Sequence, residues 1–477
     1  MKTAVYHFLI AFFIASPLIG QAQQPKDVYK KTLGAVLTEV EQTFQVKINC
    51  DDRLKNAEVQ YASWRITSDL GHTLDNILNP IGLGYREMGN NTYLISRYEY
   101  YRRSESAGSA HLDELLKSYP DAAAFDKRKR ALRNCMLTAL GINQQIKRTP
   151  LNPIIRAKVK MHGYTVQNVA FESIPGYFVC GTLYLPNDGP KPFPVILSPN
   201  GHFYGAGESM TGEGSGRYGK DVQYRCAALA KMGAIVFNYD MYSWGESAVQ
   251  TGSTSFHETG FSLAIQTWNS MRALDFLLSL PNADKSRVGV TGASGGGTQS
   301  FLLAALDDRI SISVPVVMVS SSFYGGCPCE SGLPIHDLCD GHKTNNTEIA
   351  ALIAPKPLLV ISDGTDWTRS VPGTDYPYLK KIYGFYGKGA NIENVHLPNE
   401  GHDYGYSKRV PMYGFFAKKL GLNLNAVKNK AGKVDESGCR IQKHTEMQVF
   451  TPANAWPLTA LKGHEAIQKA FLYYHSQ

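Results

Sequence analysis

The chain has 477 residues, of which 43% are hydrophobic and 19% charged, a balance that excludes an intrinsically disordered protein. A formal net charge of +8 is spread along the chain, and the one short basic run, Lys127–Arg130, is typical of a solvated helix face, so nucleic acid is not an expected partner. This length predicts a large core and at least one accessory domain.

The amino-terminal residues predict an export signal. A basic start is followed by an apolar run from Ala4 to Ile19 and by small residues suited to signal peptidase. We therefore expect residues 1–22 to be a cleaved signal peptide and the mature protein to be periplasmic or secreted. We expect no membrane span, because this run is short and interrupted by Pro17, and no other stretch is long and apolar enough.

Residues 25–98 predict a small α+β domain. Apolar residues recur at helical spacing from Lys31 to Phe44, and strand candidates follow, the last two joined by a Gly-Asn-Asn turn. The pattern resembles the small secretin and TonB amino-terminal domain of exported bacterial proteins. That resemblance implies a docking or spacing role, and hence a docking partner, since the segment shows no catalytic constellation.

The rest of the chain predicts one large α/β domain. Residues 99–153 are interpreted as a helical linker, 154–422 as the catalytic domain and 423–477 as a tail packed on it. Within the domain, helical segments alternate with strand candidates, which is the pattern of a mostly parallel sheet covered by helices. The strand candidates are GTLYLP, PVILSP, GAIVFNYD, RVGVTG, SISVPVVMV, KPLLVISDG and IENVHLP.

The segment from Gly292 to Gly296 matches the G-x-S-x-G pattern of a nucleophile elbow. It directly follows a strand candidate and directly precedes a helix candidate, which is the context that gives the pattern its meaning. The glycines leave room for a sharp turn that holds the serine in a strained conformation. We therefore expect Ser294 to be a nucleophile.

Partners for this serine occur in the chain order of an α/β-hydrolase, in which an acid follows a later strand and a histidine follows the last one. The segment PLLVISDGTDWT supplies Asp363 and Asp366, and VHLPNEGHDYG supplies His402. A histidine takes the proton of Ser294, and a carboxylate fixes its tautomer. We favour Asp366 as the acid and interpret Asp363 as a turn residue. Glu330 is the alternative acid, from a place that some carbohydrate esterases of this fold use.

Two further segments complete the predicted site. Ester cleavage needs two N–H donors for the developing oxyanion, and we expect them from Gly295 and from the loop 198–207, where Gly201 and His202 turn the chain into the site. The sequence Cys327-Pro328-Cys329 lacks the two-residue gap of a zinc site, and so favours a disulfide-stiffened loop or buried thiols over a metal. We predict no metal and no organic cofactor.

Residues from about Cys180 to Leu422 resemble the α/β-hydrolase fold. The motifs GGCPCESG, EIAALIAPKPLLV and DGTDWT resemble exported bacterial carbohydrate esterases of the acetyl xylan esterase and pectin methylesterase group. In that group the positions of Ser294, Asp366 and His402 form the triad. The elbow departs from the glucuronoyl esterases, which carry Cys-Ser-Arg there, so a uronate–lignin ester is a less favoured substrate.

The resemblance implies a serine esterase acting on a plant cell-wall polysaccharide. We place the methyl ester of galacturonate in pectin ahead of an acetyl ester, largely on this resemblance, and the positive charge of the chain is compatible with an acidic sugar. A serine peptidase would need an extra domain guarding the site, and a non-catalytic binding protein is disfavoured because every triad member is present. The expected substrate-binding residues are Trp244, Trp367, Arg369 and Arg217.

Overall fold

The computed structural model describes residues 29–61, 66–78, 81, 83–97, 103–203, 212, 214–330, 333–336 and 343–477, so the predicted signal peptide lies outside the described residues. The chain divides into two compact units, Met1–Tyr98 and Glu99–Gln477. Among the described residues, no helix combines the length and the apolar character needed to cross a membrane.

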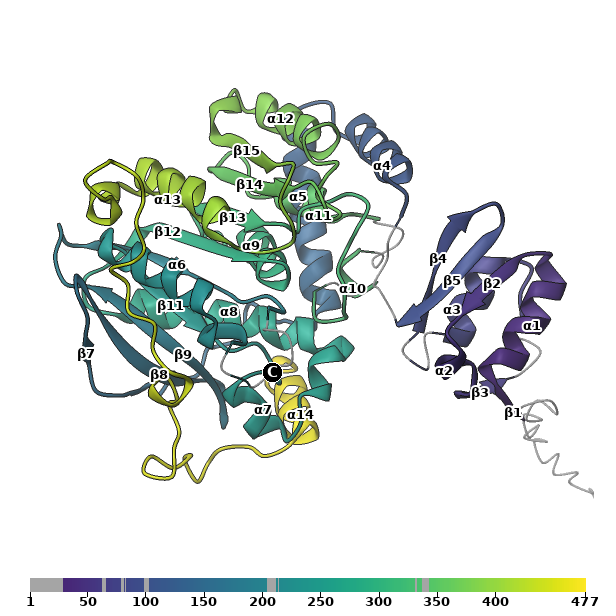
Figure 1. The fold of residues 1–477 in the computed structure, drawn as a ribbon, viewed down its shortest axis with the longest axis horizontal. Helices are drawn as coiled ribbons and strands as arrows, with labels where there is room; N and C mark the ends of the chain where they lie inside the picture. The colour runs from purple at the N-terminus through teal and green to yellow at the C-terminus, as the bar shows by residue number, and fades with distance from the viewer. Residues whose placement is uncertain are drawn as a thin grey trace, which may run out of the picture. The chain divides into compact units, whose positions relative to one another are not determined.

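The amino-terminal unit packs helices against two small sheets. Thr32 caps the first helix by accepting from the Ala35 N–H, and the apolar face of that helix, which includes Leu33, Val36 and Val40, is buried in the core of the unit. Strands β1 and β3 pair antiparallel, and a second sheet has the order β2-β5-β4. The elements are β1 (Tyr29–Thr32), α1 (Leu33–Phe44), β2 (Lys47–Cys50), α2 (Asp52–Lys55), β3 (Glu58–Tyr61), α3 (Leu70–Leu78), β4 (Leu83–Gly89) and β5 (Thr92–Arg97) (Figure 1).

Helices α4 (Glu105–Ser118) and α5 (Ala122–Ala139) open the larger unit. Their apolar side chains, such as Leu112, Phe125 and Leu132, are buried in the same hydrophobic cluster as the strands and helices of the main sheet. The interpretation of residues 99–153 as a linker is therefore wrong, because burial of these side chains makes both helices part of the folded core.

The larger unit is built on one ten-stranded sheet, with the order β15-β14-β13-β12-β10-β11-β9-β8-β6 and β7 paired to β8. Strands β10 to β15 pair in parallel, whereas β6 to β9 form an antiparallel extension. All seven strand candidates lie in this sheet, which confirms the predicted α/β class. The strands are β6 (Ile154–Ile155), β7 (Val159–Lys160), β8 (Tyr164–Ile174), β9 (Tyr177–Pro186), β10 (Phe193–Leu197), β11 (Ile235–Tyr239), β12 (Ala283–Ala293), β13 (Ile312–Val316), β14 (Leu358–Asp363) and β15 (Ile392–Leu397).

Helices cover both faces of the sheet, because side chains alternate along each strand. On β10, Val195 and Leu197 join the cluster of α8 and α9, whereas Ile196 joins that of α6 and α13 (Figure 1). The helices are η3 (Gly216–Tyr218), α6 (Lys220–Lys231), α7 (Glu246–Thr251), η4 (Ser255–Glu258), α8 (Gly260–Ser279), α9 (Gly295–Leu306), α10 (Leu333–His336), α11 (Asn346–Ala351), α12 (Asp375–Phe385), η5 (Gly389–Asn391), α13 (Tyr406–Leu420), η6 (Leu424–Val427), η7 (His444–Glu446) and α14 (His464–His475).

The last residues run back over the larger unit. Glu246 accepts hydrogen bonds from the backbone N–H groups of Val449 and Phe450, at 2.9 and 2.8 Å. The final helix, α14, buries Ile467 and Phe471 in the main core. The tail is thus fixed by both polar and apolar contacts.

Candidate active site

Ser294 stands between the end of β12 and the start of α9, in a backbone conformation that is rare for a residue with a side chain (φ 55°, ψ −125°). Its N–H donates to the Val316 carbonyl at 3.1 Å, which anchors this conformation to the neighbouring strand. A Cβ at Gly292 or Gly296 would lie 2.5 Å from the Pro199 carbonyl oxygen. Only glycine fits at these two positions, so the sequence G-x-S-x-G is dictated by the close approach of the loop after β10.

The same loop brings Gly201 against the serine. A Cβ at Gly201 would lie 2.3 Å from the Ala293 carbonyl oxygen and 2.9 Å from the Ser294 Cβ. Gly295, on the other side, begins α9 directly after the serine. Gly201 and Gly295, two of the three residues predicted to build the oxyanion hole, thus both lie beside Ser294, and the third, His202, directly follows Gly201. Residues 204–207 of the predicted loop lie outside the described residues.

His402 follows β15 and is paired with Asp366, which follows β14. The His402 Nδ1 lies 2.6 Å from Asp366 Oδ2, and the other carboxylate oxygen accepts from the N–H and the hydroxyl of Thr368, both at 2.6 Å. The Trp367 ring packs on the imidazole, with ring centres 4.6 Å apart. Because Nδ1 carries the proton shared with Asp366, Nε2 is left to accept one. This is the arrangement of a general base.

The two other acid candidates have different neighbours. Asp363 accepts from the backbone N–H groups of Thr365 and Asp366, at 3.1 Å each, and so shapes the turn that carries Asp366. Burial, and the nearby Asp366 carboxylate, raise the pKa of Asp363. Of the three carboxylates considered, Asp366 is therefore the one bonded to the Nδ1 of His402.

Glu330 contacts the nucleophile. Its Oε1 accepts from the Ser294 hydroxyl at 3.3 Å and pairs with the Nδ1 of His202 at 2.8 Å, while Oε2 accepts from the Gly326 N–H at 2.6 Å. Burial disfavours the charge, but His202 and the Gly326 N–H outweigh it and lower the pKa of Glu330 to about 2, with a further contribution from His402. Glu330 is thus a buried carboxylate that touches the nucleophile directly.

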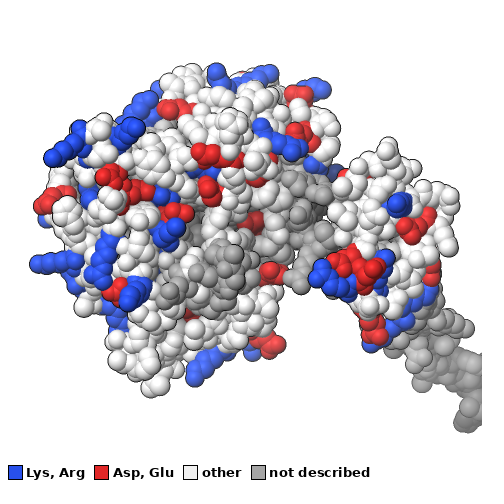
Figure 2. Space-filling model, viewed as in Figure 1, with Lys and Arg blue, Asp and Glu red and all other residues white. Residues whose placement is uncertain are grey.

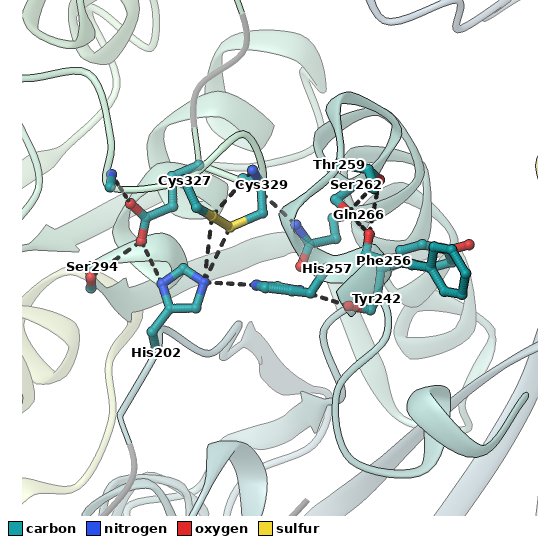
Figure 3. The surroundings of a disulfide bond; sticks show 12 residues. His202, Tyr242, Phe256, His257, Thr259, Ser262, Gln266, Ser294, Cys327 and Cys329 are labelled. Carbon is teal, nitrogen blue, oxygen red and sulfur yellow. Dashed lines mark hydrogen bonds and ion pairs between the residues drawn. A yellow bond between two sulfur atoms is a disulfide. The ribbon is translucent and has the colours of Figure 1, made fainter. Parts of the chain in front are cut away.

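A second histidine extends this network (Figure 3). His257 donates from Nδ1 to the Tyr242 carbonyl, and its Nε2 lies 2.7 Å from the Nε2 of His202. Burial, together with the adjacent His202, lowers the pKa of His257 to about 3, so its Nε2 is an acceptor. That Nε2 therefore accepts from the Nε2–H of His202, whose Nδ1 faces the Glu330 carboxylate.

Cys327 and Cys329 are joined by a disulfide that lies against the same imidazole. The Sγ of Cys329 is 3.1 Å from the His202 Nε2. The ligand atoms of His202, His257 and the two cysteines lie within 4.8 Å of one another. The sulfurs are nevertheless bonded to each other, and zinc binds thiolates, so the oxidised group lacks two of the ligands that a zinc site would need.

Two predicted substrate-binding residues are buried instead. Arg217 is fully buried, with its Nε donating to Asp240 at 2.8 Å and its Nη2 paired with Glu246. Trp244 is 1% exposed, and its Nε1–H donates to the Ser215 hydroxyl. Both predictions are wrong, because neither side chain presents surface to a substrate. Arg217 holds the tail through the Met447 carbonyl, and Trp244 packs on the two histidines.

The other two predicted substrate-binding residues lie closer to the site. Trp367 stacks on Phe323, with ring centres 3.9 Å apart, as well as on His402. Arg369 is mostly exposed and pairs with Glu105 of α4 at 2.6 Å. Their role in binding substrate stays a prediction.

The sequence contains no signal for His257, and none for a role of the His202 side chain. Fifty-five positions separate these two histidines, and His257 belongs to the short helix η4, with no motif around it. The only hint was the Cys-Pro-Cys-Glu segment, in which Glu330 was already a candidate acid.

Comparison with known proteins gives these residues a context. The solved structure of methylesterase BT1017 matches with a TM-score of 0.74 and 38% identity, over 94% of this chain and 98% of that one. A family model described as "Glucuronyl esterase, fungi" matches residues 223–330, which include Ser294 and Glu330.

Curated proteins match shorter stretches, among them a bacterial protein and a fungal esterase. The protein YtaP of Bacillus subtilis, whose name describes a hydrolase, is 28% identical over 236 residues, 46% of this chain and 74% of its own. The 4-O-methyl-glucuronoyl methylesterase of Thermothelomyces thermophilus is 26% identical over 202 residues, 34% of this chain. That match spans half the length of the fungal esterase.

Proposed function

The chain belongs to the same family of α/β-hydrolase carbohydrate esterases as methylesterase BT1017, and we propose that it removes the methyl group from methyl-esterified uronates in a polysaccharide. The observation that carries the proposal is the similarity to a methylesterase over 94% of this chain, in a protein that has a strained serine and a histidine whose Nδ1 is held by Asp366. Pectin, with galacturonate as its uronate, is the substrate we favour.

The chemistry follows from the hydrogen bonds. Asp366 keeps the proton of His402 on Nδ1, so Nε2 takes the proton of Ser294 as its oxygen attacks the ester carbonyl. Methanol leaves with that proton, and the sugar's own carboxyl group stays on the serine as an acyl-enzyme. Water, activated by the same imidazole, then releases the uronate. In the free protein the Ser294 hydroxyl donates to Glu330, so it has to turn toward His402 for the first step.

Methyl esters are favoured over acetyl esters by the comparisons. Both BT1017 and the fungal relative are named as methylesterases. In such a reaction the acyl group is the sugar itself, so the site must accommodate a sugar ring next to Ser294. An acetyl esterase needs room only for an acetyl group at that point.

Two uronates are candidates for the methyl-esterified sugar, galacturonate and glucuronate. The preference for galacturonate is based on the positive charge of the chain and on the resemblance of its motifs to the pectin methylesterase group. Glucuronate is favoured by the family model over residues 223–330 and by the name of the fungal relative. The elbow Ala293-Ser294-Gly295, in place of Cys-Ser-Arg, separates this chain from the glucuronoyl esterases and keeps galacturonate first.

The test is product release from three substrates: native pectin, acetylated xylan and the methyl ester of 4-O-methyl-glucuronate. We expect methanol from pectin, reduced by about three orders of magnitude or more in Ser294→Ala. Ser286→Ala, an exposed serine on the same strand β12, is the matched control and should retain full activity. Methanol from the glucuronate ester alone would select the second candidate. Acetate alone, or methanol release that survives Ser294→Ala, would refute the proposal.

A further inference from the structure

A cavity of about 580 Å³ lies beside the candidate active site. Its wall includes Phe203, whose ring packs on His402 with ring centres 5.6 Å apart, and Asp403 and Tyr404, which directly follow that histidine. The start of α6 and residues 441–444 of the tail close the other sides. A polysaccharide with one ester at Ser294 would therefore have this cavity next to it.

The cavity is lined by Arg225, a buried arginine on α6. This side chain is 2% exposed, its Nε donates to the Ser198 hydroxyl at 3.0 Å, and its guanidinium lies over the Tyr404 ring at 4.5 Å. Among the described residues, no carboxylate oxygen lies within 4.0 Å of its nitrogens. Arg225 is thus a buried cation held in place by neutral groups.

The two acidic residues among the described lining of the cavity are already engaged. Asp221 accepts from Arg409 at 3.0 Å, and Asp403 accepts from Lys408 at 2.7 Å. Lys220 and Lys443, which also line the cavity, are exposed and add positive charge at its rim. Figure 2 shows acidic and basic side chains interspersed on the face that it draws. Because this mixed face is not a broad basic surface, we look to a single buried cation to bind an anion.

Burying a guanidinium without a counter-ion is costly, and natural proteins usually pair such a group. An arginine that is fixed by Ser198 and Tyr404, but whose remaining N–H groups meet no acid in the described part of the chain, is preorganised for a planar anion. We propose that this cavity binds the free carboxylate of a uronate next to the esterified sugar, with Arg225 as the carboxylate-binding residue. The proposal rests on the proposed function and makes the preferred substrate a partly de-esterified polyuronate.

The first test compares two substrates of equal length. We expect kcat/KM for methanol release to be higher on partly methylated oligogalacturonate than on the fully methylated form, and Arg225→Met to remove this preference. The loss should be at least about tenfold on the partly methylated substrate, as expected for one hydrogen-bonded charge. Lys418→Met, which removes one exposed positive charge on α13, is the control and should keep the preference. A preference unchanged in Arg225→Met would overturn the proposal.

The second test measures binding without catalysis. Ser294→Ala is titrated calorimetrically with fully de-esterified trigalacturonate, and then again with Arg225→Met added. We expect the dissociation constant to rise at least about tenfold with the second substitution, and equal affinities would overturn the proposal. Arg225-dependent binding in a protein that releases no methanol from any substrate would retain the carboxylate site and reject the esterase function.

Folding is checked by thermal unfolding. Should Arg225→Met fail to fold, Arg225→Lys keeps the charge but loses the two parallel N–H groups of the guanidinium. It should then weaken trigalacturonate binding in the same direction by a smaller factor. An affinity for trigalacturonate equal to that of the parent protein would count against the assignment.

Discussion

The candidate active site contains two histidine–carboxylate pairs, and they differ in what contacts the second nitrogen of the imidazole. The Nδ1 of His402 is 2.6 Å from Asp366, and that of His202 is 2.8 Å from Glu330. The imidazoles are also similarly exposed, at 27% and 24%. The Nε2 of His202, however, faces another histidine, whereas that of His402 has no hydrogen-bond partner among the described residues. A pair with one free nitrogen can move a proton, while a pair engaged at both nitrogens holds a fixed charge.

The largest loss of activity should come from breaking the His402–Asp366 pair, in which Nε2 has no described hydrogen-bond partner. In Asp366→Asn the amide no longer fixes the proton of His402 on Nδ1, so Nε2 is not reliably an acceptor, and we expect kcat to fall by about 10⁴-fold. Steady-state methanol release at pH 7 measures it. The unfolding temperature should change little, because asparagine has nearly the shape of the aspartate.

The contradicting result would be a small effect. If Asp366→Asn lost less than tenfold while Glu330→Gln lost several thousandfold, Glu330 would be the acid of the catalytic histidine. His202–Glu330 would then be the pair that moves the proton, and His402–Asp366 would be the pair that does not.

Glu330→Gln should have a smaller effect, since it alters the fixed-charge pair. The amide oxygen can still accept from Ser294 or Gly326, but the negative charge beside the His202 imidazole is lost. A hydrogen bond to a charged group contributes roughly 1.5–3 kcal/mol, so we expect kcat/KM to fall by about 10- to 100-fold. His202→Gln should lower kcat/KM by a similar amount, and the double variant should lose little more, because both changes remove one interaction. Fully additive losses would show that the two residues act separately.

A third prediction concerns the pH dependence of folding. The pKa of His257 is about 3 in the folded protein because of its burial and of His202, against about 6.5 when unfolded. Between these values the unfolded chain binds more protons, so stability is lost as the pH falls below 6.5. At pH 5 the loss from this residue is about 2 kcal/mol, from about 1.4 kcal/mol per pH unit.

Urea unfolding at pH 7 and pH 5 measures this difference. His257→Gln should lose less stability than the parent protein between the two pH values, even if it is less stable at both. The corresponding window for Glu330 is lower, because its stabilising charge is present above about 4.5 and is lost as the pH falls toward 2. An identical pH 7 to pH 5 difference in both proteins would contradict the role given to His257.

Local sequence was sufficient where the determinants are consecutive residues. The strand–turn–helix at Ser294 could be predicted because glycines at fixed offsets have a steric meaning, and its context is two adjacent elements. The Asp366–His402 pairing followed from strand order, since consecutive parallel strands β14 and β15 end at the same edge of the sheet.

Charge pairing between distant residues could not be predicted in the same way. Arg217 and Arg225 are eight positions apart, and the sequence favoured Arg217 as a substrate ligand. The structure pairs Arg217 with Asp240 and Glu246, whereas the described partners of Arg225 are Ser198 and an aromatic ring. Which arginine is neutralised depends on how β11 and α7 pack against the start of α6, and no local pattern reports that.

The smallest expected effect belongs to the disulfide, which touches the fixed-charge pair alone. A Cys327–Cys329 bond closes a loop of only three residues, so the loss of unfolded-state entropy is small, and the double variant Cys327→Ala/Cys329→Ala should lose about 1.5 kcal/mol of unfolding free energy. Urea unfolding measures it, with Cys50→Ala, a free cysteine of the amino-terminal unit, as the control. Activity should fall less than in Glu330→Gln, because the sulfurs only pack against His202 while the carboxylate carries its charge. A loss of activity as large as that of Asp366→Asn would mean that the disulfide positions Ser294 itself. The roles of the His402–Asp366 and His202–Glu330 pairs could then not be distinguished by these variants.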